Sequence, residues 1–132
     1  MDTEALLSLY YELLAARDQE GLRQLLAPDV VVTYHAQRDQ LPWAGTFHGH
    51  AGFDEFLKLV SQHVEIVDAD RLPPIIANDH AIVRTQGRWR VDATDKIVSG
   101  SMINVFTMSA GTIVAYEVWA DTAAFVEGLR PD

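Results

Sequence analysis

The chain has 132 residues, enough for one domain with a packed core and too few for two, so we expect a single domain over residues 1–132. Hydrophobic residues make up 48% and charged residues 22%, a balance typical of a folded globular domain rather than a disordered chain. The net charge of −9 disfavours nucleic-acid binding, and the absence of cysteine excludes disulfides, thiol nucleophiles and cysteine-bound metals.

Apolar residues at three- and four-residue spacing predict three helices in the first half of the chain. The first covers residues 3–16, and Asp18 caps a shorter second helix that Pro28 ends. After a β-rich run over residues 30–35, the third helix covers residues 51–62. A long polar loop lies between that run and the third helix. Such loops in small domains are usually there for binding, so this region predicts a small-molecule pocket.

Strand patterns dominate the second half of the chain. We expect strands at residues 65–69 (continuing raggedly to 77), 81–92, 97–108 and 112–121, and a short final helix at 123–129. Helices first and long antiparallel strands afterwards indicate an α+β domain rather than a parallel α/β sheet. Because strands of about ten residues coil strongly, we predict a curved antiparallel or mixed sheet that packs on three N-terminal helices and forms a cone-shaped pocket.

Three histidines are candidates for chemistry. His35 follows the buried-looking run VVVTY, and histidine is a residue type that often transfers protons in enzymes. The alternative without chemistry is an exposed histidine at the end of a strand. His48 and His50 flank Gly49 and could join His35 in a metal site, but no carboxylate lies at ligand spacing nearby. We therefore expect no metal and no organic cofactor.

Polar and apolar residues alternate along the expected strand at 81–92. The polar set is Arg84, Gln86, Arg88, Arg90 and Asp92. The simplest interpretation is a solvated strand face opposite a packed one, with ion pairs between neighbouring strands.

Three segments carry a resemblance to a known family: YYELLAARDQEGLRQLLAPDVVV (10–32), the block PWAGxxxGxxxF (42–53) and GTIVAYEVWAD (111–121). Together they resemble the SnoaL-like branch of the ketosteroid-isomerase-like superfamily, which shares the nuclear transport factor 2-like cone fold. That superfamily includes isomerases, cyclases, epoxide hydrolases, dehydratases and non-catalytic domains. The resemblance therefore implies a fold and leaves the reaction open.

The steroid isomerases of this superfamily imply roles for three residues. Tyr10 matches a tyrosine that donates a hydrogen bond to a developing enolate. Asn104 falls at the position of a second donor, a protonated aspartate in those enzymes. Tyr34 falls near the position of their carboxylate base, which this chain lacks.

Other branches point to further polar residues. Arg90, Asp92 and Asp121 look similar to the Arg-x-Asp pair and the late aspartate of limonene-type epoxide hydrolases. In SnoaL-like polyketide cyclases an aspartate is the acid–base group, and Asp121 and His35 are the nearest counterparts here. Asp121 also precedes Thr122 directly, so it could instead cap the final helix.

Two hypotheses of different class follow. The first is a cofactor-independent acid–base enzyme (isomerase, cyclase or epoxide hydrolase) that acts on a small hydrophobic carbonyl or epoxide compound, with Asp121, His35 and Tyr10 as catalytic residues. The residues expected to bind substrate are Asn104, Tyr34, Trp43, Phe56, Met102, Phe106, Trp119, Arg90 and Asp92. The alternative is a non-catalytic module on the same fold that binds a small hydrophobic ligand.

Apolar residues on the outer face of the strands at 97–108 and 112–121 predict a homodimer, because exposed apolar patches usually meet a partner. No apolar run reaches the length of a membrane span, and the first ten residues do not resemble a secretory signal. We expect a cytoplasmic protein that binds neither membrane nor nucleic acid.

Overall fold

The structure is a computed structural model that describes all 132 residues. It contains the helices α1 (Thr3–Ala15), α2 (Gln19–Leu25), α3 (Gly49–His63) and α4 (Thr122–Leu129). The strands are β1 (Leu26–Tyr34), β2 (Gly45–His48), β3 (Val64–Arg71), β4 (Ile75–Ala77), β5 (His80–Val91), β6 (Ile97–Ser109) and β7 (Thr112–Ala120). No helix combines the length and the apolar character needed to cross a membrane.

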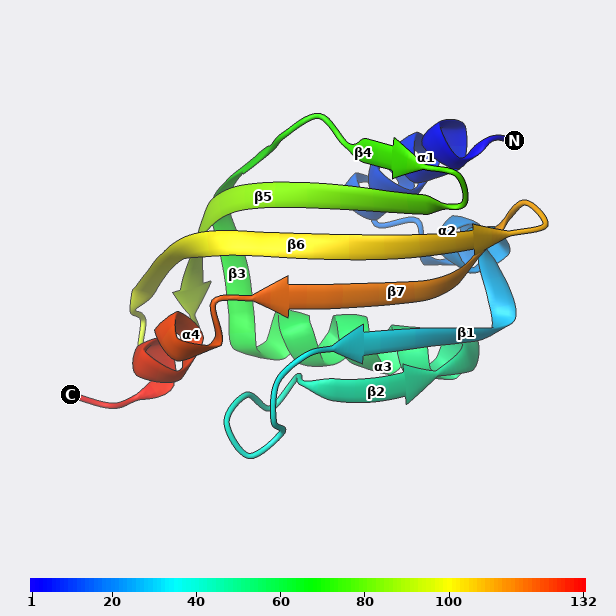
Figure 1. Ribbon diagram of the computed structural model, residues 1–132. Coiled ribbons are helices and arrows are strands. Elements are labelled where there is room, and N and C mark those ends of the chain that lie inside the picture. The colour runs from blue at the N-terminus through cyan, green and yellow to red at the C-terminus, as the bar shows by residue number, and fades with distance from the viewer.

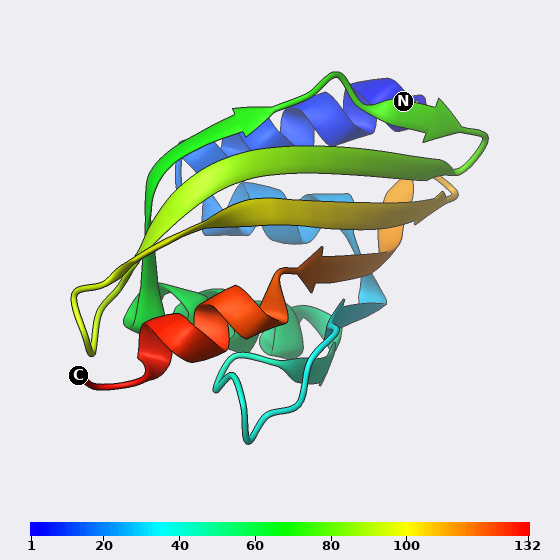
Figure 2. The ribbon, with the colours of Figure 1, turned by 60° about the vertical axis from the view of Figure 1, so that its left-hand side comes forward.

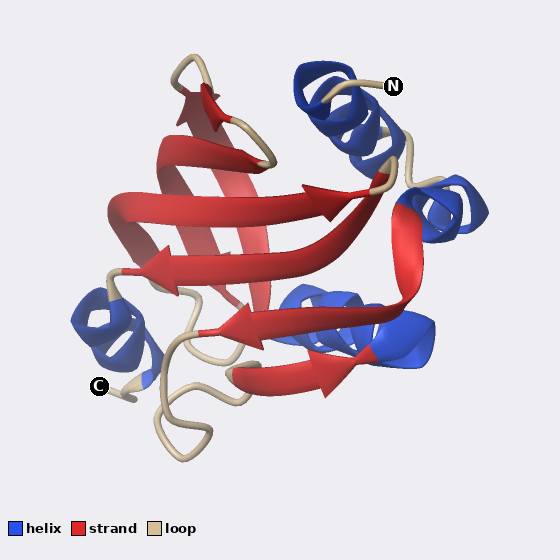
Figure 3. Ribbon diagram, turned by 45° about the vertical axis from the view of Figure 1, so that its right-hand side comes forward, coloured by secondary structure: helices blue, strands red, loops and turns tan.

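One curved sheet contains all seven strands (Figures 1 and 3). The strand order is β2-β1-β7-β6-β5-β3, and β4 pairs with the first residues of β5. Strands β1 and β7 run parallel, and every other pair is antiparallel. The expected α+β domain with a curved mixed sheet is therefore confirmed.

Helices α1, α2 and α3 lie on the inner face of this sheet, as the apolar periodicity predicts. Leu6, Leu7 and Tyr10 are buried on α1, and Phe53 and Phe56 are buried on α3. Figure 1 looks onto the opposite, outer face, where β5, β6, β7 and β1 lie side by side with no helix across their centre. The core therefore lies between the sheet and the three helices.

The region around Pro28 differs from the sequence prediction. Helix α2 ends at Leu25, and β1 begins at Leu26, so Pro28 lies within the strand. The pairing of β1 with β7 shifts register between Leu26 and Val31. Proline has no backbone N–H to donate, which confines it to such irregular positions in a sheet.

The short helix α4 closes one end of the cone (Figure 2). Its Phe125 is buried, and the Phe125 ring lies 5.8 Å from Trp43 and 5.6 Å from Trp89 between ring centroids. Gly128 lets the helix approach the sheet, because a Cβ there would overlap the Val98 side chain. Aromatic packing at this end therefore comes from three separate parts of the chain.

Candidate functional site

Four tyrosines and one asparagine meet inside the cone, and we call them the tyrosine cluster: Tyr10 and Tyr11 from α1, Tyr34 from β1, Asn104 from β6 and Tyr116 from β7. The Tyr10 ring lies 5.3 Å from Tyr11 and 5.9 Å from Tyr116 between centroids, in edge-on arrangements. These geometries are the ones that aromatic pairs favour. The cluster therefore joins the first helix to three strands of the sheet.

Phenylalanine rings surround the tyrosine cluster. Phe106 stacks on Tyr116 at 4.8 Å with nearly parallel planes, and Phe56 lies 6.2 Å from Tyr116 and 6.3 Å from Tyr34. Phe53 packs on Tyr10 at 6.5 Å. The polar atoms of the cluster are thus enclosed by apolar rings.

Three polar atoms of the tyrosine cluster are buried without a partner at hydrogen-bond geometry: the hydroxyls of Tyr10 and Tyr34 and the Oδ1 of Asn104. Tyr116 lies near the Tyr10 hydroxyl and Trp43 near the Tyr34 hydroxyl, but neither contact meets that geometry. The amide of Asn104 is otherwise engaged, because its Nδ2 donates to the Tyr11 hydroxyl at 3.1 Å. Most buried polar groups in folded proteins are paired, and leaving one unpaired costs about 1–3 kcal/mol. Unpaired atoms gathered in one place mark the interior of the cone as the candidate site.

The register of the sheet places two of these residues on one row of the inner face. Asn104 pairs with Val118 across β6 and β7, and Val118 pairs with Tyr34 across β7 and β1. Neighbouring strands lie about 4.8 Å apart, so roughly 10 Å separate the Asn104 and Tyr34 backbones. The short Val118 side chain lies between them, which leaves the two polar side chains facing the same space.

Burial raises the pKa of Tyr10, Tyr34 and Tyr116 above the usual value of 10.0. These hydroxyls therefore stay protonated at neutral pH and are available as hydrogen-bond donors. No aspartate, glutamate or histidine is among the buried residues. The interior can offer neutral donors and one amide acceptor, and it holds no group that is ionised at neutral pH.

Asp121 does not reach this interior. The residue is exposed, and its Oδ1 accepts a hydrogen bond from the Ala124 backbone N–H at 3.1 Å, so it caps α4. The expected position of this carboxylate inside the cone is wrong, and the capping alternative is confirmed.

A β-bulge explains the error at this end of β7. Strict alternation from Gly111 would place residues 113, 115, 117, 119 and 121 on one face. Residue 113 pairs with Met108 but residue 115 pairs with Thr107, which leaves Val114 as an extra residue. One extra residue turns every later side chain to the other face. Tyr116 and Val118 therefore point inward, and Trp119 points outward.

His35 lies on the outer face with Trp119, which excludes both from the interior. The two rings stack at 3.9 Å with an interplanar angle of 7°. The Nε2 of His35 lies 3.0 Å from the Oε1 of Glu117, within hydrogen-bond distance. The inward position expected for Trp119 is wrong, because this residue is 42% exposed on the far side of the sheet.

Arg90 and Asp92 also lie outside the cone. Arg90 forms ion pairs with Glu65 at 3.2 Å, with Asp92 at 3.2 Å and with Asp95 at 3.0 Å. The inward-facing residues on this stretch of β5 are Trp89 and Val91. The solvated-face interpretation is confirmed, and Arg90 and Asp92 do not lie where binding of a substrate inside the cone would require them.

The remaining predicted site residues lie on the inner side. Trp43, Phe56 and Phe106 are buried in the core as expected, and Met102 is half-buried against it. Tyr116 is not among the site residues predicted from the sequence. Its position two residues before the inward-facing Val118 would have identified it, once the bulge was known.

The three candidate metal-binding histidines do not converge. The Nε2 of His50 lies 3.0 Å from the Leu26 carbonyl, His48 is exposed, and His35 is paired with Glu117. No group of three or more histidine, aspartate or glutamate side chains lies in an arrangement that could hold a metal ion.

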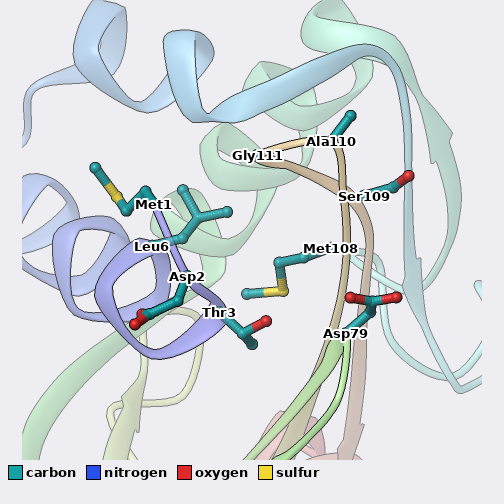
Figure 4. A pocket seen from close by; sticks show the side chains of 9 residues that line it. All are labelled: Met1, Asp2, Thr3, Leu6, Asp79, Met108, Ser109, Ala110 and Gly111. Atoms are coloured by element: carbon teal, nitrogen blue, oxygen red, sulfur yellow. The ribbon is translucent and has the colours of Figure 1, made fainter.

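Two surface hollows lie outside the tyrosine cluster. One, of about 270 Å³, is lined by Met1, Asp2, Thr3, Leu6, Asp79, Met108, Ser109, Ala110 and Gly111 (Figure 4). The other, of about 250 Å³, lies between the start of β6 and α4. Neither of these two hollows reaches the interior of the cone, where the sequence predicts an apolar pocket.

Comparison with known proteins gives one family and a common fold. The family model described as a SnoaL-like domain matches residues 7–116, which is most of the chain. None of the curated proteins matches the sequence. An NTF2-like protein from Burkholderia xenovorans superposes with a TM-score of 0.88 at 20% identity over 97% of this chain and 95% of that one.

Two further solved structures share the fold. TerC, co-crystallised with polyporic acid, has a TM-score of 0.79 at 24% identity and covers 96% of this chain and 97% of its own. A Mesorhizobium loti protein, provisionally described as a SnoaL-like polyketide cyclase, has a TM-score of 0.73 at 17% identity over 90% of this chain and 99% of that one. At these identities the likeness establishes the cone fold.

Proposed function

The chain belongs to the SnoaL-like domain family, and we propose that it binds a small, largely apolar molecule inside the cone through an oxygen-bearing group on that molecule. The observation that carries this proposal is the set of unpaired buried atoms on Tyr10, Tyr34 and Asn104. Unpaired buried polar atoms destabilise a fold, so the presence of three of them in one cluster favours a bound molecule that forms hydrogen bonds with them.

The chemistry of these atoms defines what the molecule must carry. The tyrosine hydroxyls are protonated and can donate to a carbonyl or ether oxygen, whereas Asn104 Oδ1 accepts from a hydroxyl or an N–H. The surrounding rings favour a flat hydrocarbon body. A protein of the same fold, TerC, is co-crystallised with polyporic acid, which supports an oxygen-bearing organic ligand for this cone.

The two described hollows do not reach the tyrosine cluster, and we propose that side chains move when the molecule enters. Tyr11, a member of the cluster, and Met102 are only half-buried. Methionine is flexible and adapts to the shape of its neighbours. We assign the opening motion to these two side chains.

The acid–base enzyme hypothesis keeps one supporting observation. Neutral tyrosine hydroxyls in a dry site are donors of the kind that stabilises a developing enolate. A proton-abstracting group is missing among the buried residues, so ligand binding without turnover is the better supported function. A screen of ketones, lactones and epoxides distinguishes the two, because turnover of any of them favours the enzyme.

The binding proposal is tested by calorimetric titration with 1-indanone and with indane, which has the same ring system without the oxygen. Tyr10→Phe/Tyr34→Phe removes both unpaired hydroxyls, and Thr33→Val removes a hydroxyl next to Tyr34 that faces outward. We expect the wild type to bind 1-indanone about tenfold more tightly than indane, at about 0.5–1.5 kcal/mol for each hydrogen bond.

The double variant should bind the two compounds equally, and Thr33→Val should behave as the wild type. Equal binding of both compounds by the wild type, or binding of neither, contradicts the proposed function.

We also propose that two copies associate through the uncovered outer face of the sheet. Ile103 and Trp119 lie opposite each other there and are 40% and 42% exposed. Arg84 lies beside Ile103 at one end of this stripe, and Glu117 lies near the other end. A two-fold axis through the stripe would bring Arg84 of each copy toward Glu117 of the other, which makes the surface self-complementary.

A further inference from the structure

Arg71, the last residue of β3, lies over the edge of the tyrosine cluster. Its guanidinium carbon is 4.1 Å from the centroid of the Tyr11 ring, which is a cation–π distance. The Tyr11 hydroxyl accepts the hydrogen bond from Asn104 Nδ2. The half-buried Tyr11 therefore contacts both the exposed Arg71 and the amide of Asn104, whose Oδ1 is unpaired.

Arg71 has no carboxylate within ion-pair distance, although the chain has 19 acidic and 10 basic residues. Nearby arginines on the sheet are paired: Arg88 with Asp68, and Arg90 with three carboxylates. The other arginines without a carboxylate partner are Arg17, Arg38 and Arg84. None of them stacks on a ring of the tyrosine cluster, since Arg38 lies over Phe47.

The charge of Arg71 acts on the interior of the cone. Burial raises the pKa of Tyr10 and Tyr11, and the positive charge of Arg71 opposes that rise at both hydroxyls. The same field stabilises any negative charge that enters the cluster. Because the whole chain carries a net charge of −9, an anion needs a local cation of this kind to bind here.

We propose that the molecule bound in the cone is an organic anion, an apolar ring that carries a carboxylate or an acidic enol, and that Arg71 selects it by its charge. This inference rests on the proposed binding function and specifies its ligand class. The ring of the anion packs among the aromatic side chains, its charged oxygen lies toward Arg71, and the Tyr10 hydroxyl donates to it. Arg71 is thus a specificity-determining residue, and it reaches the ligand from the side of the cone between α1 and β3.

The test compares indane-5-carboxylate with indane-5-carboxamide, which has nearly the same shape and no charge, by calorimetric titration at pH 7.5. We expect the wild type to bind the carboxylate about three- to tenfold more tightly than the carboxamide, the range typical of a partly exposed charge contact. Arg71→Gln should remove this preference, and Arg71→Lys should retain it. Arg17→Gln removes another arginine without a carboxylate partner, on the exposed segment after α1, and should keep the preference unchanged.

Salt provides a second readout. Raising sodium chloride from 50 to 500 mM should weaken carboxylate binding to the wild type and leave the Arg71→Gln variant unaffected, because salt screens only the charge contact. Two results overturn the anion proposal while the binding function stands. One is equal or tighter binding of the carboxamide by the wild type, and the other is a carboxylate preference that survives in Arg71→Gln. Binding of neither compound also overturns the anion proposal, and the 1-indanone titration then decides the binding function separately.

Discussion

Replacing Tyr34 by phenylalanine should stabilise the ligand-free protein, which is unusual for a change in a core. The Tyr34 hydroxyl is buried without a partner, so its removal relieves a desolvation cost of about 1–3 kcal/mol. The small void left by the oxygen offsets part of that gain. We expect the free energy of unfolding to rise by about 1 kcal/mol, equivalent to about 3–5 °C in melting temperature for a chain of this length.

The matched variant Tyr11→Phe should have the opposite effect. The Tyr11 hydroxyl accepts a hydrogen bond from Asn104 Nδ2, and its loss leaves that amide with no partner on either side. We expect a loss of about 1–2 kcal/mol. The phenylalanine ring still packs under Arg71, so the hydroxyl alone accounts for the difference.

Urea unfolding followed by tryptophan fluorescence measures both variants, since Trp43 and Trp89 are buried in the fold. The reasoning requires effects of opposite sign with unchanged dependence on urea. Equal destabilisation by Tyr34→Phe and Tyr11→Phe would show that the Tyr34 hydroxyl has a partner in the folded protein, and the assignment of the cluster as a binding site would then lose its basis.

Three further predictions concern other parts of the molecule. Asp121→Ala should destabilise the fold by about 0.5–2 kcal/mol through loss of the α4 cap and leave 1-indanone binding unchanged. Asp121→Asn should retain most of the stability, because asparagine also caps helices. Weaker 1-indanone binding by Asp121→Ala without destabilisation would contradict this. Because burial raises the tyrosine pKa values in the folded protein, the free energy of unfolding should hold below pH 10 and fall above it, by up to about 1.4 kcal/mol per pH unit for each tyrosine. The fall should be less steep in Tyr34→Phe. A urea midpoint that stays constant from pH 9 to 11.5 would oppose this. Trp119→Glu should convert the proposed dimer into a 14.7 kDa monomer in sedimentation experiments, and a wild type that already sediments as a monomer would refute the dimer.

Local sequence patterns predict the helices and long strands well. The helices expected at 3–16 and 51–62 are α1 (Thr3–Ala15) and α3 (Gly49–His63). The strand expected at 97–108 is β6 (Ile97–Ser109). Periodicity and capping residues lie within each segment, so these elements can be identified without knowing their neighbours.

The errors in the candidate site come from features that depend on pairing between distant segments. The bulge at Val114 exists only relative to β6, and it reverses the faces of Trp119 and Tyr116. Likewise, β2 forms only because Gly45–His48 pairs with β1. The aspartates, the histidine and the arginine singled out from the sequence lie outside the cone, and the polar atoms inside it belong to tyrosines and an asparagine.

The most direct test of the central claim is a crystal structure of the protein soaked with 1-indanone. We expect the bound ketone among Tyr10, Tyr34 and Asn104, with its oxygen within about 3.2 Å of a tyrosine hydroxyl and with Tyr11 or Met102 displaced. A ketone found only in the hollow between β6 and α4, or at the start of α1, with the tyrosine cluster unchanged, would contradict it.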